Sequence, residues 1–361
     1  MTGDNRLSVG IVGAGIMGRL IALKGESMGW KVTLFDKGDE TASDACSFRP
    51  PAMLAPVTEL DVSEPVIAQL GAESLKLWPK IVRETGEKVF FQQIGSLIVA
   101  HPRDRGELSR FKNSLATKAG TDAFRTVAGE ELKELEPQLD SCFAEGLYVP
   151  DEGQVNSRGA LLALAKALKD RGVECRYGTE APSFSAKKIV ANDTTHDFDM
   201  VIDARGYGAK DDLPDLRAVR GEIIRIRAPE VKLNRPVRLL HPRYPLYVVP
   251  HENDEYVIGA TSIESEDDSP VSVRSALELL SAAFALNAAF GEARIMELSV
   301  GLRPAFPDNL PRIYCEEGLL RVNGLYRHGY LMSPKIAELV CDYVVNGRKD
   351  PAYASLFRGG A

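Results

Sequence analysis

A glycine-rich turn between a buried strand and a helix restricts the fold of this chain more than any other feature of its sequence. Residues 7–12 form a short apolar run, which is typical of a strand buried on both faces. The turn follows, and helical spacing then continues to residue 28, where Gly29 supplies a stop. A second apolar run at 31–36 closes a strand–helix–strand unit, which predicts an α/β fold of the Rossmann type.

The turn has the spacing of a dinucleotide-binding loop, with glycines at its first, third and sixth positions. Its residues are Gly13, Ala14, Gly15, Ile16, Met17 and Gly18, and Asp36 ends the second strand. The first glycine permits a tight turn, the second lets the backbone approach a pyrophosphate, and the third lets helix and strand pack closely. The pyrophosphate then meets free N–H groups at the helix N-terminus. Asp36 is expected to accept hydrogen bonds from ribose hydroxyls. A ligand-free glycine turn is the alternative, and the turn does not separate FAD from NAD.

Apolar spacing predicts further helices and strands along the chain. Helices are expected at 66–84, across Leu108, Phe111 and Leu115, at 157–172, at 276–290 and at 334–345. Ser157 and Ser333 are the expected N-caps of two of them, with Pro334 in a first turn. Strands are expected at 89–91, 96–100, 173–177, 187–191, 200–204, 294–300 and 319–322. Alternation of period two at 222–227, 246–249 and 256–260 predicts antiparallel strands with one face in water.

This order of segments predicts two domains, since 361 residues exceed what one core usually organises. The dinucleotide-binding domain is expected at 1–85, 146–218 and 301–361. A mostly antiparallel substrate-binding domain is expected to be inserted as 86–145 and 219–300.

Composition excludes several classes of function. The net charge of −7 argues against nucleic acid, and no basic run favours an anionic membrane. Five scattered cysteines indicate free thiols in a reducing compartment. The N-terminus lacks the features of a signal peptide and no apolar run has membrane-spanning length, so a cytoplasmic protein is expected. The histidines show no metal-binding spacing, and no metal is expected.

Eight segments spread over most of the chain resemble one family of flavoproteins. They are residues 9–37, 52–56, 153–156, 201–206, 246–250, 258–261, 301–304 and 325–330. In this order they resemble the glycine oxidases of thiamin biosynthesis, within the D-amino-acid oxidase and sarcosine oxidase family. The resemblance implies a D-amino-acid-oxidase-like fold and FAD held without a covalent bond. It implies cofactor contacts from the glycine turn, Asp36 and Lys37, from the backbone near Ala181, and from Arg327, His328, Gly329 and Tyr330.

The resemblance also implies a substrate and a reaction. Arg303 is expected to hold the carboxylate of a small amino acid, glycine in the first place, aided by Tyr247, with Met53 and Arg327 at the same site. An arginine fork suits this task because two parallel hydrogen bonds fix the direction of a carboxylate. Hydride passes to the flavin, giving an imine, and oxygen regenerates the flavin with release of hydrogen peroxide. The imine is expected to supply thiamin thiazole synthesis. No side chain is assigned as a catalytic acid or base.

Purely structural interpretations stand beside these roles. Arg303 would otherwise pair with a surface carboxylate, Tyr247 and Met53 would be core residues, and His328 would be a hydrogen-bonding spacer. The sequence departs from the family at Phe48-Arg49-Pro50-Pro51-Ala52, where two prolines remove backbone donors, and at Arg205.

Three rival functions remain open. They are a flavin-dependent D-amino-acid or sarcosine oxidase or dehydrogenase, an NAD-dependent dehydrogenase, and a non-catalytic FAD-binding protein. A homo-oligomer is also expected.

Overall fold

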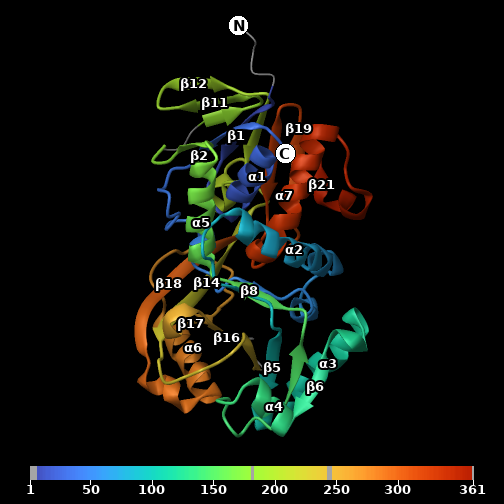
Figure 1. Cartoon of the computed structure of the whole chain (residues 1–361), viewed down its shortest axis with the longest axis vertical. Coiled ribbons are helices and arrows are strands. Elements are labelled where there is room, and N and C mark those ends of the chain that lie inside the picture. The colour runs from blue at the N-terminus through green and yellow to red at the C-terminus, as the bar shows by residue number, and fades with distance from the viewer. Residues whose placement is uncertain (1–5, 180–182, 242–245, 360–361) are drawn as a thin grey trace.

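A computed structural model describes residues 6–179, 183–241 and 246–359, and it contains two large sheets in separate halves of the molecule (Figure 1). The first sheet has seven strands in the order β21-β19-β20-β13-β1-β2-β9. Its strands are β1 (Ser8–Val12), β2 (Lys31–Phe35), β9 (Glu174–Arg176), β13 (Met200–Asp203), β19 (Arg312–Glu316), β20 (Leu319–Asn323) and β21 (Phe357–Arg358). Every neighbouring pair is parallel except β19 with β20.

Helices cover one face of this sheet. They are α1 (Ile16–Ser27), α5 (Ser157–Asp170) and α7 (Gly329–Asn346), and α1 packs against both α5 and α7. Helix α2 (Pro65–Glu84) packs against α7. A small sheet of β10 (Ser183–Ser185), β11 (Lys188–Ala191) and β12 (Thr194–Asp197) covers the other face. With both faces covered, apolar residues fill the central strands, as parallel sheets require. The predicted α/β fold of Rossmann type is therefore confirmed.

The second sheet has eight strands in the order β18-β14-β17-β16-β15-β5-β7-β6. Its strands are β5 (Ser96–Ala100), β6 (Arg125–Ala128), β7 (Glu145–Val149), β14 (Arg217–Arg227), β15 (Val237–Leu240), β16 (Leu246–Pro250), β17 (Glu255–Gly259) and β18 (Arg294–Ala305). All pairs are antiparallel except β5 with β15. This agrees with the mostly antiparallel sheet expected. Strands β7, β14 and β18 each run across one of the expected domain boundaries. The division into two domains stays a prediction.

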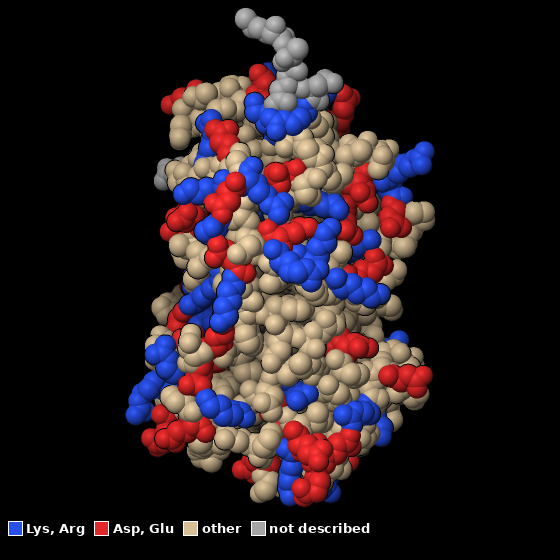
Figure 2. Space-filling model, in the orientation of Figure 1, with Lys and Arg blue, Asp and Glu red and all other residues tan. Residues whose placement is uncertain are grey.

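Smaller elements complete the molecule. Helices α3 (Arg105–Ala119), α4 (Glu130–Leu135) and α6 (Val273–Leu286) pack around the second sheet. A three-stranded sheet of β3 (Met53–Leu54), β8 (Gly153–Val155) and β4 (Phe91–Gln92) lies between the two halves (Figure 1). Figure 2 shows acidic and basic side chains intermixed on one face of the molecule, with mostly uncharged surface near its middle.

The prediction that the alternating strands have one face in water is wrong. Strand β14 is buried along nearly its whole length, and β16 and β17 are almost fully buried. The Arg220 guanidinium of β14 donates to the buried Glu222 carboxylate over 2.6 Å, and Arg225 is buried although two of its nitrogen atoms have no hydrogen-bond partner among the described residues. Polar residues in this strand therefore do not mark a face in water, and α6 covers the face that carries Ile224 and Ile226.

The prediction for the start of the last helix is also wrong, because α7 begins at Gly329, five residues before Pro334. A proline inside a helix leaves the carbonyl four residues earlier without its backbone donor. That carbonyl belongs to Tyr330, and it accepts a hydrogen bond from Trp78 Nε1 of α2 over 3.0 Å instead. Ser333 is no N-cap, and its hydroxyl donates to the Gly329 carbonyl.

Three smaller predictions need correction. Asn156, and not Ser157, caps α5: its side chain accepts from the Gly159 N–H over 3.0 Å. The strand expected at 89–91 includes only Phe91, within β4. The helix expected at 276–290 ends at Leu286, because Asn287 adopts an extended conformation and its side chain starts a short 3₁₀ turn.

Candidate active site

The glycine turn leaves room in front of helix α1. Gly13 has φ +105°, and a Cβ there would lie 2.6 Å from the Ala204 carbonyl oxygen. A Cβ on Gly18 would lie 1.8 Å from the Gly13 carbonyl oxygen. Internal packing therefore demands both of these glycines. A Cβ on Gly15, by contrast, would meet only the Ser47 hydroxyl, at 3.3 Å. Gly15 is also the N-cap of α1 and has no side chain of its own to cap the helix. The Ser47 hydroxyl accepts from the Ile16 N–H over 3.3 Å, and the helix N-terminus presents an anion-binding end to that space.

Asp36 holds this turn in place. One carboxylate oxygen accepts from the Ala14 N–H over 2.5 Å, and the other accepts from the Gly38 N–H over 2.7 Å. Each oxygen keeps a lone pair with which it can accept from a ribose hydroxyl. Lys37, the next residue, is exposed.

Arg19 is a residue of this region that the sequence did not single out. Its buried guanidinium donates to three carbonyl oxygens, those of Ala14 at 2.6 Å, Leu161 at 2.5 Å and Glu40 at 2.9 Å. Burial lowers its pKa. The guanidinium thus fixes the glycine turn relative to α5. The only sequence signal was an arginine within an apolar helix.

A second helix N-terminus lies beside the first. Gly329 begins α7, and a Cβ on it would lie 4.0 Å from Ile16 at the start of α1. The Tyr330 hydroxyl lies 2.8 Å from the Ser47 carbonyl oxygen, so the segment around Ser47 is held against both helices. The expected contacts at Gly13–Gly18, Gly329 and Tyr330 are thus gathered around one space.

The side chain of Arg303 on β18 extends over Gly221 of the neighbouring strand β14. A Cβ on Gly221 would lie 2.2 Å from the Arg303 Nη2, so glycine leaves space for the guanidinium in this position, and a larger residue would require the arginine side chain to move. Nη1 donates to the Thr261 carbonyl oxygen over 2.9 Å. No ion pair joins Arg303 to a carboxylate of the residues that the structure describes. Burial and the nearby Arg327 lower its pKa, yet a guanidinium stays protonated at any working pH.

Glu59 stands at the centre of the remaining predicted residues. The Tyr247 hydroxyl donates to Glu59 Oε1 over 2.6 Å. Arg327 Nε lies 3.4 Å from Glu59 Oε2, and His328 Nδ1 lies 3.8 Å from it. Burial by itself would raise the pKa of Glu59, but Arg327, His328, Arg238 and the Tyr247 hydrogen bond outweigh it and bring the pKa to about 2.

The neighbours of Glu59 have shifted pKa values as well. Burial lowers the pKa of His328 to about 4, so its imidazole is neutral near pH 7. Burial raises the pKa of Tyr247, and the tyrosine stays a hydrogen-bond donor. Arg238 donates to the Thr58 carbonyl oxygen over 3.0 Å and lies over the Tyr247 ring at 5.3 Å.

Glu152 supports the short helix that carries Glu59. Its carboxylate accepts from the Val57 and Thr58 N–H groups over 3.0 and 2.6 Å. Burial raises its pKa to about 7. Glu59, Arg238 and Glu152 belong to no sequence motif, and for this reason none of them was predicted.

The unusual segment at 48–52 bridges the two halves of the molecule. The Arg158 guanidinium lies over the Phe48 ring at 4.1 Å and donates to Glu297 of β18 over 2.6 Å. Arg49 lies 3.7 Å from the same carboxylate. The Pro50 carbonyl oxygen accepts from the Ser157 hydroxyl. The segment is therefore held between α5 and the strand that bears Arg303.

The other predicted positions are placed as follows. Met53 lies half-buried on β3, paired with Gln154 of β8, and is absent from the described hydrophobic clusters. Arg205 forms ion pairs with Asp203, at 2.9 Å, and with Asp212. Ala181 lies outside the described residues.

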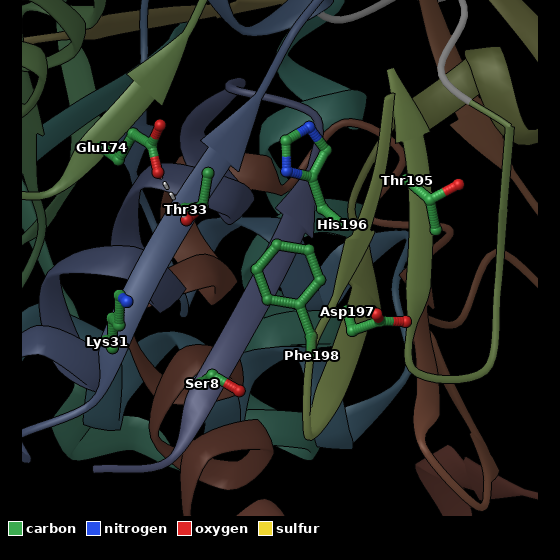
Figure 3. A pocket seen from close by; sticks show the side chains of 8 residues that line it. All are labelled: Ser8, Lys31, Thr33, Glu174, Thr195, His196, Asp197 and Phe198. Atoms are coloured by element: carbon green, nitrogen blue, oxygen red, sulfur yellow. Dashed lines mark hydrogen bonds between the residues drawn. The ribbon is translucent and has the colours of Figure 1, made fainter. Parts of the chain in front are cut away.

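A surface cavity of about 300 Å³ lies away from these groups (Figure 3). It is bordered by side chains of β1, β2 and β9 on one side and of the β11–β12 hairpin and residue 198 on the other. Thr33 and Glu174 are hydrogen-bonded across two of these strands. None of the predicted site residues lines this cavity, so we place the candidate site at the glycine turn and Arg303.

Residues 8–343 match the family described as FAD dependent oxidoreductase. The chain belongs to this family. It is an FAD-dependent oxidoreductase, and the N-termini of α1 and α7 suit a dinucleotide because Gly15 has no side chain and a Cβ there would meet only the Ser47 hydroxyl.

Individual members of the family are similar over the whole chain. A Rhizobium etli protein, whose name ThiO assigns it to the oxidoreductases of thiamine biosynthesis, is 38% identical over 94% of this chain and 97% of its own. The glycine oxidase of Geobacillus kaustophilus is 28% identical over 97% of this chain and 95% of its own. A crystal structure of glycine oxidase from Geobacillus kaustophilus superposes with a TM-score of 0.84, at 27% identity and 98% coverage of both chains.

Membrane-spanning helices and clustered metal ligands are both missing from the described part of the chain. No helix there is long and apolar enough to span a membrane. The same residues contain no cluster of three or more histidine, cysteine, aspartate or glutamate residues that could hold a metal ion.

Proposed function

We propose that this FAD-dependent oxidoreductase oxidises glycine at its α-carbon to an imine that hydrolyses to glyoxylate, or a similarly small amino acid to the corresponding imine. The observation that carries the proposal is the Arg303 guanidinium, which protrudes over Gly221 and has no carboxylate partner among the described residues. Similarity to glycine oxidase and to ThiO supports the same substrate class.

The protein groups would act by holding the substrate. Arg303 would grip the carboxylate through two parallel hydrogen bonds and so fix the direction of the α-carbon. FAD, when bound, supplies the acceptor for the hydride. The Tyr247 hydroxyl lies 3.4 Å from Nη2 of Arg327, the neighbour of Arg303, and would therefore lie beside this site. Met53 would contribute an apolar wall.

No side chain is assigned to abstract a proton. Glu59 is ionised but is already engaged by Tyr247 and Arg327, and His328 is buried beside it. The substrate amine would therefore lose its proton to solvent on binding. The protein contributes position and charge, which are what such a reaction needs.

The cofactor contacts are proposed for the residues around the two helix N-termini. The glycine turn would hold the pyrophosphate and Asp36 the ribose, with Lys37 beside it. Arg327, His328, Gly329 and Tyr330 would face the flavin. Positive charge at Arg327 and at the start of α7 favours electron density on the ring system. We expect the binding to be non-covalent.

The wider role is proposed from the same similarity. Molecular oxygen would be the electron acceptor, with release of hydrogen peroxide, and the imine would supply thiamin thiazole synthesis. The enzyme would act in the cytoplasm as a homo-oligomer.

A flavin-reduction screen tests the proposal. The purified holoenzyme is mixed anaerobically with glycine, sarcosine or D-alanine, and flavin absorbance is followed; peroxide is then measured under air. Glycine should reduce the flavin and yield peroxide. Faster flavin reduction by sarcosine or D-alanine would identify that amine, and not glycine, as the substrate. Flavin reduction without peroxide under air would indicate a dehydrogenase. A flavin that no amine reduces would overturn the proposal.

A further inference from the structure

The candidate site contains more positive charge than one carboxylate can neutralise. Arg327 lies close enough to Arg303 to lower the pKa of the Arg303 guanidinium. Arg238 is buried behind them and is directed at the Thr58 carbonyl oxygen and two aromatic rings. Among the described residues, the carboxylate found in an ion pair with one of these three arginines is that of Glu59.

Glu59 contacts Arg327 directly and acts on Arg303 only from a distance, as a smaller influence on the Arg303 pKa than burial or Arg327. Its Oε2 lies 3.4 Å from Arg327 Nε, while Oε1 accepts from the Tyr247 hydroxyl. No ion pair between Glu59 and Arg303 is found among the described residues. Of the two neighbouring guanidinium groups, Arg327 therefore has a carboxylate in contact, whereas Arg303 has none among the described residues.

We propose that Glu59 determines substrate specificity by occupying Arg327, so that the site accepts amines with one carboxylate and rejects amines with two. A second carboxylate on the substrate would have to displace Glu59 from Arg327 or lie beside its negative charge. Either outcome is costly in a partly buried site, where like charges interact strongly. The inference rests on the proposed function, since it assumes that Arg303 holds a substrate carboxylate.

Glu59→Gln is the matched variant for a test. Glutamine has the same shape and its Oε1 still accepts from Tyr247, but it cannot compensate Arg327. Acetate and malonate serve as non-oxidisable probes with one and two carboxylates. Their dissociation constants are measured by the change in flavin absorbance of the holoenzyme. We expect the preference for malonate over acetate to rise about tenfold or more in Glu59→Gln, which corresponds to about 1.4 kcal/mol.

Arg327 provides the control. If the gain arises from a freed guanidinium, the double variant Glu59→Gln/Arg327→Met should lose it. In Arg327→Met alone, the Glu59 charge is uncompensated, so the dissociation constant of malonate should rise at least about tenfold more than that of acetate. This single variant decides the question if Glu59→Gln does not fold. An unchanged ratio of the two constants in a folded, flavin-loaded variant would overturn the inference.

The test separates this inference from the proposed function. Wild-type enzyme that is reduced by glycine, with a malonate-to-acetate ratio that neither variant alters, contradicts only the role of Glu59. Wild-type enzyme that binds acetate and shows the predicted shifts, but is reduced by no amine, contradicts only the proposed reaction. In a turnover assay of Glu59→Gln, kcat/KM for iminodiacetate should rise relative to kcat/KM for glycine. The value for N-propylglycine, which has a similar length but no second charge, should not rise relative to glycine.

Discussion

Replacement of Arg303 by alanine should abolish most of the activity while leaving a folded, yellow protein. Charge-assisted hydrogen bonds contribute about 1.5–3 kcal/mol each, so loss of a two-bond fork removes about 3–6 kcal/mol. At 1.4 kcal/mol per decade, kcat/KM for glycine should fall by about 10² to 10⁴-fold. Stability should change little. Within the protein the guanidinium donates to the Thr261 carbonyl oxygen at 2.9 Å, and its charge is disfavoured by burial and by Arg327.

The assay is stopped-flow reduction of the flavin by glycine, with flavin content and thermal unfolding of the variant measured in parallel. Arg227→Ala is a matched control, because Arg227 lies at the far end of β14 in an exposed pair with Glu255. The control should keep wild-type kinetics. A fully flavin-loaded Arg303→Ala enzyme with kcat/KM within about fivefold of wild type would refute the assignment, since that loss is only about 1 kcal/mol.

Three further predictions concern stability and cofactor binding. The pKa of Glu59 falls from an ordinary 4.5 to about 2 on folding, so its ionisation stabilises the protein fully above pH 4.5, and roughly 3 kcal/mol of the free energy of unfolding is lost as the pH falls toward 2. In urea unfolding at several pH values, the free energy of unfolding of Glu59→Gln should fall less steeply with decreasing pH than that of wild type. An equal pH dependence in the two proteins would contradict the shifted pKa. Trp78→Phe removes the donor to the Tyr330 carbonyl inside α7, and should cost about 1–3 kcal/mol in urea unfolding because a buried acceptor is left without a partner. Gly15→Ala should weaken FAD binding in a flavin titration yet leave the apoprotein as stable as wild type, whereas Gly18→Ala, with its Cβ 1.8 Å from a backbone oxygen, should destabilise the apoprotein itself.

The parts of the molecule that the sequence predicted well depend on local patterns. The glycine turn, helix α1 and Asp36 lie within one strand–helix–strand unit, and their spacing alone determines their arrangement. Arg303 and Tyr247 were identified through the family resemblance, and the structure brings both to the same region through Arg327.

Glu59 escaped prediction because its environment is assembled from distant segments. It lies 188 residues from Tyr247, and nothing in the sequence around it distinguishes it from a surface glutamate. The start of α7 was misplaced for the same reason. Pro334 normally marks a first turn, and the donor that lets it sit deeper comes from Trp78 on another helix.

The alternation in β14 was misinterpreted because a polar residue in a strand was equated with water. Arg220 and Glu222 are polar, periodic and buried, and each satisfies the other. Distinguishing that case requires knowing that α6 covers the strand. Sequence patterns of this kind give the direction of a side chain and say nothing about what lies above it.

The missing side chain at Gly221 ties the history of two positions together. Any larger residue there would collide with the guanidinium that lies over Gly221, since even a methyl carbon would lie 2.2 Å from Nη2. Alanine at 221 would displace the guanidinium from its present position, whereas loss of the arginine would remove the reason for glycine at 221. Homologues that keep arginine at 303 should therefore keep glycine at 221, and this pairing offers a way to tell which relatives still hold a carboxylate at this point.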